Sequence, residues 1–246
     1  MKINISLFLV ATALSFNLLA APNNDFLAGK SLYNQNKTSE ALAVFITAAK
    51  AGSIDAQNQV GTMYAKGIGT DINYDHALIW YRAAARNNSP EALYNIGKLY
   101  QQGLGVEQDS RTAVQWYNRA LEFNSPDAAN NLADMYLEGI VVPQDHKKAE
   151  QLFIQASELG STMAQRNLGF LYFNNSGIKQ DIDKSYFWFA IAAANDYPDA
   201  AQYRDFIASK LTKKRLLKIE QQVSEWIKTN ENNQENVHTD VNQSDV

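Results

Sequence analysis

The sequence predicts an all-α fold, a right-handed solenoid of antiparallel helix pairs. Alanine recurs at a fixed interval of 36 residues, and tyrosine, tryptophan and glycine recur in step with it. A period of this length indicates helical repeats, each of which buries its apolar face by stacking on its neighbours. One elongated domain is therefore expected. The repeating alanines are Ala56, Ala92, Ala128, Ala164 and Ala200.

The first 21 residues have the features of an export signal. Lys2 is the only charge in a largely apolar segment that ends in small residues at Ala21, just before Pro22. Such a segment is removed on export, so we expect a mature protein in the periplasm or outside the cell. An uncleaved anchor is the alternative, because Leu18 and Pro22 are poorly suited to a cleavage site.

Composition narrows the classes of function. The chain has no cysteine, so we expect neither lipid attachment nor disulfides. Its net charge of −4 disfavours a nucleic-acid partner, because such binding needs basic surface to displace counterions from phosphates. After signal removal, no apolar run approaches the roughly 20 residues of a membrane helix. We therefore expect no membrane span in the mature protein.

Each 36-residue repeat is predicted to contain two helices. Ser89 can cap the first helix of the second repeat, and Pro90 suits its first position. Gly103 ends this helix, since glycine adopts the left-handed conformation common at helix ends. Asp109 then caps the second helix, as Asn73, Asp145 and Asp181 do at matching positions. The four repeats are 56–91, 92–127, 128–163 and 164–199.

The second helices carry apolar residues at helical spacing. In residues 92–127 this stripe contains Ala113, Trp116, Tyr117 and Ala120. A tryptophan stands at the same register in several repeats. We therefore predict that these tryptophans form the core between repeats rather than a ligand box. They are Trp80, Trp116 and Trp188.

The two ends of the repeat array differ from its middle. Residues 22–55 are predicted to form a shorter capping repeat, in which the loop between helices lacks four residues. Residues 200–228 are predicted to form C-terminal capping helices, because Arg204 and Asp205 replace an apolar pair. Residues 229–246 are rich in Asn, Gln, Glu and Asp, so a disordered polar tail is expected.

The repeat resembles the Sel-1-like repeat family, whose members are related to tetratricopeptide repeats. Ala133 in place of the helix glycine and Leu152 in place of tryptophan depart from its pattern. The resemblance implies an exported adaptor, often bacterial, that takes part in envelope assembly or in contacts with a host, and it implies no single activity. The pattern is carried best by Ala92, Ile96, Gly97, Tyr100, Gly103, Gly105, Val106, Asp109, Ala113, Trp116, Tyr117 and Ala120.

We predict no catalytic residue, metal site or cofactor. His76 and His146 lie near the starts of different second helices at non-equivalent positions, whereas a metal site needs converging ligands. Both are interpreted as surface residues. No Gly-x-Ser-x-Gly or Ser-x-x-Lys motif stands in a suitable setting. A non-catalytic scaffold is the expected function; a secreted host-interaction factor and a cell-wall or β-lactam hydrolase are the alternatives.

The predicted binding surface is the concave side, which first helices line in solenoids of this type. Amides there can bond the backbone of an extended peptide, and aromatic side chains can anchor it. Alternatively, the asparagines tie repeats together and the phenylalanines pack under the C-terminal cap. We expect a protein or peptide partner. The candidate residues are Tyr94, Lys98, Asn130, Asp134, Arg166, Phe170 and Phe173.

One basic cluster stands near the start of the last predicted helix, where positive charge is unfavourable. It is interpreted as a solvated face balanced by Glu220 and Glu225, or as a contact with an anionic surface. Its residues are Lys210, Lys213, Lys214, Arg215 and Lys218.

Overall fold

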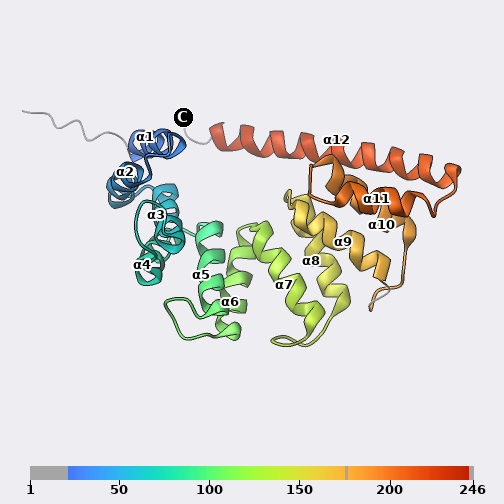
Figure 1. Ribbon diagram of the computed structural model, residues 1–246, viewed down its shortest axis with the longest axis horizontal. Helices are drawn as coiled ribbons and strands as arrows, with labels where there is room; N and C mark the ends of the chain where they lie inside the picture. Colours follow the sequence, from blue (N-terminus) through green and yellow to red (C-terminus); the bar gives the residue numbers. More distant parts are fainter. Residues whose placement is uncertain (1–21, 175–176, 244–246) are drawn as a thin grey trace, which may run out of the picture.

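The computed structural model describes residues 22–174 and 177–243, and this part of the chain folds into twelve helices with no strand. Successive helices pack on one another and follow an arch (Figure 1). The predicted all-α class and the two-helix repeat are confirmed. The expected export signal, residues 1–21, lies outside the described residues.

The helices form six sequential pairs. Four pairs correspond to the predicted repeats, and one pair stands at each end. They are α1 (Pro22–Asn34) and α2 (Thr38–Lys50), α3 (Ile54–Lys66) and α4 (Tyr74–Ala85), α5 (Pro90–Gln102) and α6 (Ser110–Glu122), α7 (Pro126–Glu138) and α8 (His146–Glu158), α9 (Thr162–Asn174) and α10 (Ile182–Ala194), and α11 (Ala200–Ala208) and α12 (Lys213–Gln243).

Local capping explains where these helices begin and end. The Ser89 hydroxyl accepts a hydrogen bond from the Ala92 backbone N–H at 3.3 Å, and serine does the same at the start of α3, α7 and α9. The Asp109 carboxylate caps α6 by accepting from two backbone N–H groups. Gly103 ends α5 in the left-handed conformation, with φ of 68°. Each of these predicted helix signals is confirmed.

The first pair has the predicted shorter turn. Three residues, 35–37, join α1 to α2, whereas seven, 67–73, join α3 to α4. The difference of four residues agrees with the expected deletion. The pair nevertheless packs on α3 in the manner of the later repeats.

Glycine lets the two helices of a repeat approach closely. A Cβ added to Gly97 would lie 2.6 Å from the Tyr117 ring, and one added to Gly169 would lie 2.8 Å from the Phe189 ring. No real Cβ tolerates such contacts, so the rings occupy the space that a larger residue would need.

In α4 and α6 the buried ring is a tyrosine and not the tryptophan beside it. Trp80 and Trp116 are half-buried, whereas Tyr81 and Tyr117, one residue further on, lie in the core. Successive helical residues point about 100° apart, and it is the tyrosine that faces the glycine of the first helix in its own repeat. The prediction is therefore wrong for Trp80 and Trp116. It is confirmed for Trp188, which is covered by α12 and lies edge-on to the Trp226 ring.

The described buried residues fall into two hydrophobic clusters. The smaller one involves α2 and α3, and the larger one extends from α4 to α12. The half-buried Tyr64 packs against both. The two clusters meet where α3 packs closely on α4, with Gly61 against the Tyr81 ring.

The C-terminal cap begins as predicted and ends later. α12 packs on α10 through a face that includes Ile219 and Val223, and it covers the end of the stack. Where a disordered tail was expected from residue 229, the helix continues to Gln243 and runs back along the open side of the arch (Figure 1). Adding residues to an existing helix requires no new nucleus, so polar residues can extend it. None of the described helices is both long enough and apolar enough for a membrane span.

Candidate binding groove

A pocket of about 400 Å³ opens between α7, α8 and α9, and we call it the α7–α9 pocket. Asp134 enters it from α7, and Arg166 and Phe170 enter it from α9. Asp134 and Phe170 occupy the same repeat position, 36 residues apart. Stacking of neighbouring repeats therefore brings these three candidate residues to one surface.

A second pocket, of about 430 Å³, lies between α9, α10 and α11, and we call it the α9–α11 pocket. Phe170 and Phe173 line it from α9, and Tyr203 and Phe206 line it from α11. Phe170 lines both pockets, so they are adjacent parts of one groove. Phe206 is 51% exposed, so its ring gives the groove an accessible aromatic surface.

Three of the candidate residues, Tyr94, Lys98 and Asn130, line neither pocket. Tyr94 and Lys98 stand on α5, where the Lys98 ammonium lies 5.5 Å from the centre of the Tyr94 ring. The Tyr94 ring packs 5.6 Å from the Tyr117 ring, and burial raises the pKa of Tyr94 to about 12. The Tyr94 ring belongs to the packing of α5 against α6 of the same repeat.

The asparagines of the first helices tie repeats together. Asn167 donates a hydrogen bond to Asn130 at 3.1 Å, and Asn95 donates one to Asn58 at 3.3 Å. Each bond joins adjacent repeats. Asn130 is buried and its amide also donates to Asp134 at 3.3 Å, so it supports the groove from beneath. These hydrogen bonds support the alternative interpretation, in which the asparagines tie neighbouring repeats together.

Asp134 supplies an unusual carboxylate at the base of the α7–α9 pocket. Burial, followed by the nearby negative charge of Glu138, raises its pKa from 3.8 to about 6. Ion pairs within the described residues join Arg204 to Asp205 and Arg215 to Asp183, so no cation lies within 4.0 Å of Asp134. The carboxylate is thus desolvated without a charged partner.

Arg166 interacts with aromatic rings rather than with Asp134. The centre of its guanidinium lies 4.6 Å from the Phe170 ring and 5.9 Å from the Tyr197 ring. Phe170 in turn packs edge-on against Phe189 and Tyr203, at 4.9 and 4.7 Å between ring centres. Phe170 is therefore shared between the groove and the contact of α9 with the C-terminal cap.

His146 is a pocket residue that sequence reasoning missed. It lines the α7–α9 pocket, and its Nδ1 is a buried atom for which the described structure holds no hydrogen-bond partner. The expectation of a surface histidine is therefore wrong. A Cβ added to Gly177 would collide with the imidazole, and nothing in the spacing of the histidines signals this contact. Across residues 22–174 and 177–243, no three acidic or histidine side chains converge as a metal site requires.

The pattern of the whole chain places it in a family. Four segments match the Sel1 repeat, at residues 54–89, 90–122, 126–161 and 162–197, and together they cover more than half of the chain. The protein belongs to the Sel1 repeat family. The matched segments begin two residues before the repeats inferred from the alanine register, which is a difference of phase and not of architecture.

Solved Sel1 repeat structures resemble the chain over most of its length. A Sel1 repeat protein from Oxalobacter formigenes is 27% identical, with a TM-score of 0.69 over 83% of this chain and 87% of that one. An immunity protein from Pseudomonas aeruginosa is 16% identical, with a TM-score of 0.55 over 80% and 81% of the two chains. A Klebsiella pneumoniae protein described as a Sel1 repeat protein is 17% identical, with a TM-score of 0.51 over 76% and 93%. Curated proteins give no significant match.

The Sel1 repeat register also explains the residues of α11 that line the groove. Gln202 lies 36 residues after Arg166, and Phe206 lies 36 residues after Phe170. The cap therefore continues the groove positions of the Sel1 repeats, although its packing residues differ. The 36-residue spacing of these side chains is visible in the sequence, but residues 200–228 are predicted only as a cap and not as part of the binding surface.

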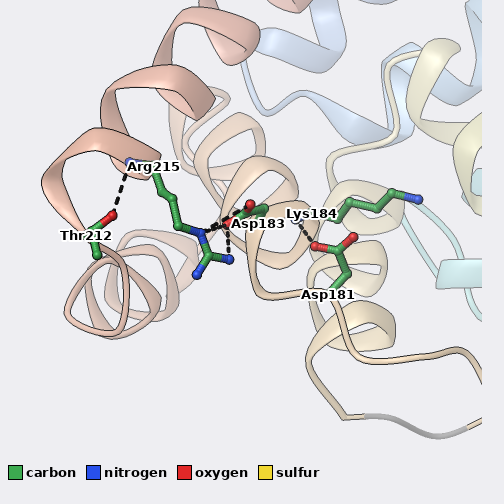
Figure 2. Close-up of polar contacts among 5 residues, drawn as sticks. All are labelled: Asp181, Asp183, Lys184, Thr212 and Arg215. Carbon is green, nitrogen blue, oxygen red and sulfur yellow. Dashed lines mark hydrogen bonds and ion pairs between the residues drawn. The ribbon is translucent and has the colours of Figure 1, made fainter.

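The basic cluster at the start of α12 is partly neutralised by the last Sel1 repeat. Figure 2 shows Arg215 pointing to Asp183 of α10, with a guanidinium nitrogen 2.6 Å from a carboxylate oxygen. The Lys210 ammonium lies 4.5 Å from the Phe206 ring centre. Among the described residues the cluster forms its ion pair with Asp183, while Glu220 and Glu225 accept hydrogen bonds from Tyr186 and Gln221. Lys213, Lys214 and Lys218 remain exposed.

Proposed function

We propose that this Sel1 repeat protein is an exported, non-catalytic scaffold that binds a protein or peptide partner through its groove. The observation that carries the proposal is the continuous surface formed by the α7–α9 and α9–α11 pockets, which combines charged and aromatic side chains. Interfaces gain most of their binding energy from a few such anchors. Solenoids present extended surfaces of this kind without requiring any chemistry. We place the function in assembly of the bacterial envelope.

Phe206 is the best residue for testing the groove. Phe170 is less suitable, because its ring packs against Phe189 and Tyr203 and its removal would also loosen the cap. Phe206 is 51% exposed. We expect Phe206→Ala to weaken partner binding by about 2 kcal/mol, the size of an interface hot spot, and to change the melting temperature little.

The measurement is affinity purification from cross-linked envelope fractions, with Phe123→Ala as the matched control. Phe123 is also an exposed aromatic residue, 39% accessible, but it ends α6 and lines neither pocket. The proposal requires the partner to be lost with Phe206→Ala and retained with Phe123→Ala. Equal recovery with both variants at unchanged stability would exclude the groove as the binding surface.

Export has an independent test. The small residues at Ala21 predict cleavage near this position, so the mature protein should begin close to residue 22. N-terminal sequencing of the protein from periplasmic and culture-supernatant fractions measures this directly. Recovery in the supernatant would favour a secreted host-interaction factor, and an intact Met1 in the cytoplasmic fraction would contradict export.

A further inference from the structure

Building on the proposed function, we propose a sequence preference for the peptide that the groove binds. The peptide is an extended segment in which a lysine or arginine enters the α7–α9 pocket beside Asp134. A large apolar side chain two residues away enters the α9–α11 pocket against Phe206. The occupant is therefore a basic and apolar segment of a partner protein.

The groove contains a negative charge, the Asp134 carboxylate, that forms no ion pair within the described chain. Asp134 accepts a hydrogen bond from the neutral amide of Asn130, and no cation of the described chain lies within ion-pair distance. Glu138 adds a second negative charge one turn further along α7. α7 also carries Asp127 and contains no basic residue. A cationic side chain would supply the counter-charge that the pocket lacks, and a desolvated pair of this kind contributes strongly to specificity.

Arg166 does not favour an acidic ligand to the same degree. Its guanidinium already lies over the Phe170 ring and donates a hydrogen bond to Asn167 at 3.4 Å. These contacts partly compensate its charge and hold it against α9. The stem of an incoming lysine or arginine can instead lie along the apolar walls that the half-buried Leu137 and Phe170 provide, with its charged end at Asp134.

The α9–α11 pocket is the reason for expecting a large apolar side chain in the peptide, two residues from the basic one. Phe173, Phe206 and Ile207 line the α9–α11 pocket, whose volume of about 430 Å³ accommodates a large side chain. Side chains two residues apart on an extended peptide point to the same side, roughly 7 Å from one another. Since Phe170 lines both pockets, one extended peptide can fill the two with such a pair.

A displayed library of random short peptides, selected on the mature protein, tests this preference. Enriched peptides should carry lysine or arginine two residues from an aromatic or large aliphatic residue. Affinities of synthetic copies are then measured by fluorescence anisotropy. Asp134→Asn should weaken binding by about tenfold or more, and Phe206→Ala should do the same. The control is Glu107→Gln, which removes an exposed carboxylate that lines neither pocket.

The outcomes separate this preference from the broader function. Acidic or uncharged peptides that need Phe206 but tolerate Asp134→Asn would overturn the basic preference and leave groove binding intact. Basic peptides that bind Asp134→Asn and Glu107→Gln equally well would also overturn it, because the attraction would then be general. If every enriched peptide ignores both Asp134 and Phe206, the groove itself is not a peptide site and the proposed function fails.

Binding should also depend on pH through Asp134. Since its pKa lies at about 6, affinity for a basic peptide should fall as the pH is lowered through this value. Glu138, His146 and Arg166 also face or border the pocket, so the Asp134→Asn variant is needed for comparison. A pH profile unchanged in Asp134→Asn would assign the effect to these neighbours and contradict the proposed contact.

Discussion

Asp134 is a single residue whose half-buried carboxylate weakens the fold. Its carboxylate is removed from water and receives one neutral hydrogen bond from Asn130, without a compensating cation. Groups with such shifted pKa values concentrate at functional sites. A binding surface is a sufficient reason for keeping a charge that destabilises the free protein.

This residue leads to a prediction about stability and pH. The folded-state pKa of about 6 exceeds the ordinary value of 3.8, so folding favours the protonated form and stability declines as the pH rises between these values. At pH 8 the free energy of unfolding of Asp134→Asn should therefore exceed that of the wild type by about 1 to 2 kcal/mol. The gain is smaller than the full change in pKa would give, because solvent screens part of the effect. Melting curves at several pH values measure the difference, which should vanish near pH 4. A less stable variant at pH 8 would contradict it, and Glu107→Gln is the control.

At the scale of elements, several helix pairs depend on a glycine that faces a ring, whereas α7 carries Ala133 at this position. Gly61, Gly97 and Gly169 allow the first helix to lie directly against the aromatic residue of the second. The helix termini are separately secured by serine, aspartate and glycine caps. The ends of a helix are thus set by its own capping residues, whereas the distance between two helices is set by the contact of glycine with the ring.

Gly97→Ala tests the contact between α5 and α6. The added methyl group would lie 2.6 Å from the Tyr117 ring, so the pair must separate. We expect a loss of roughly 1 to 3 kcal/mol in the free energy of unfolding, even though alanine favours helix more than glycine does. Urea denaturation measures the loss. In a Tyr117→Leu background the same substitution should be much less harmful; an equal loss there would show that the ring is not responsible.

At the scale of the whole molecule, the stack has an uneven core. The larger cluster of buried residues extends from α4 to α12, while α2 and α3 form a smaller one that meets it at Tyr64. In repeat proteins, stability is close to a sum of repeat and interface contributions. The smaller cluster lies at one end of the stack, where the first pair has a neighbouring pair on one side only, so this end can open before the rest.

Hydrogen exchange should reveal this division. We expect backbone amides of α1 to α3 to exchange about tenfold or more faster than those in the middle of α5 to α10, because opening the smaller cluster leaves the larger one intact. Tyr64→Ala should widen the difference by removing a contact common to both clusters. Uniform protection along the stack, unchanged by Tyr64→Ala, would indicate a single cooperative unit instead.

The sequence by itself determined the repeat, its two helices and their ends, because caps such as Ser89 and Asp109 and the apolar period act within a few residues. Stacking at a 36-residue interval also placed Asp134, Arg166 and Phe170 on one surface. Only the tertiary structure decided which of Trp116 and Tyr117 is buried, since that depends on how α6 lies against α5. The same holds for the closure of the groove by Phe206, for the asparagine pairs between repeats and for the partner of Arg215. These are contacts between segments about 30 or more residues apart in the chain, and local periodicity leaves their geometry open.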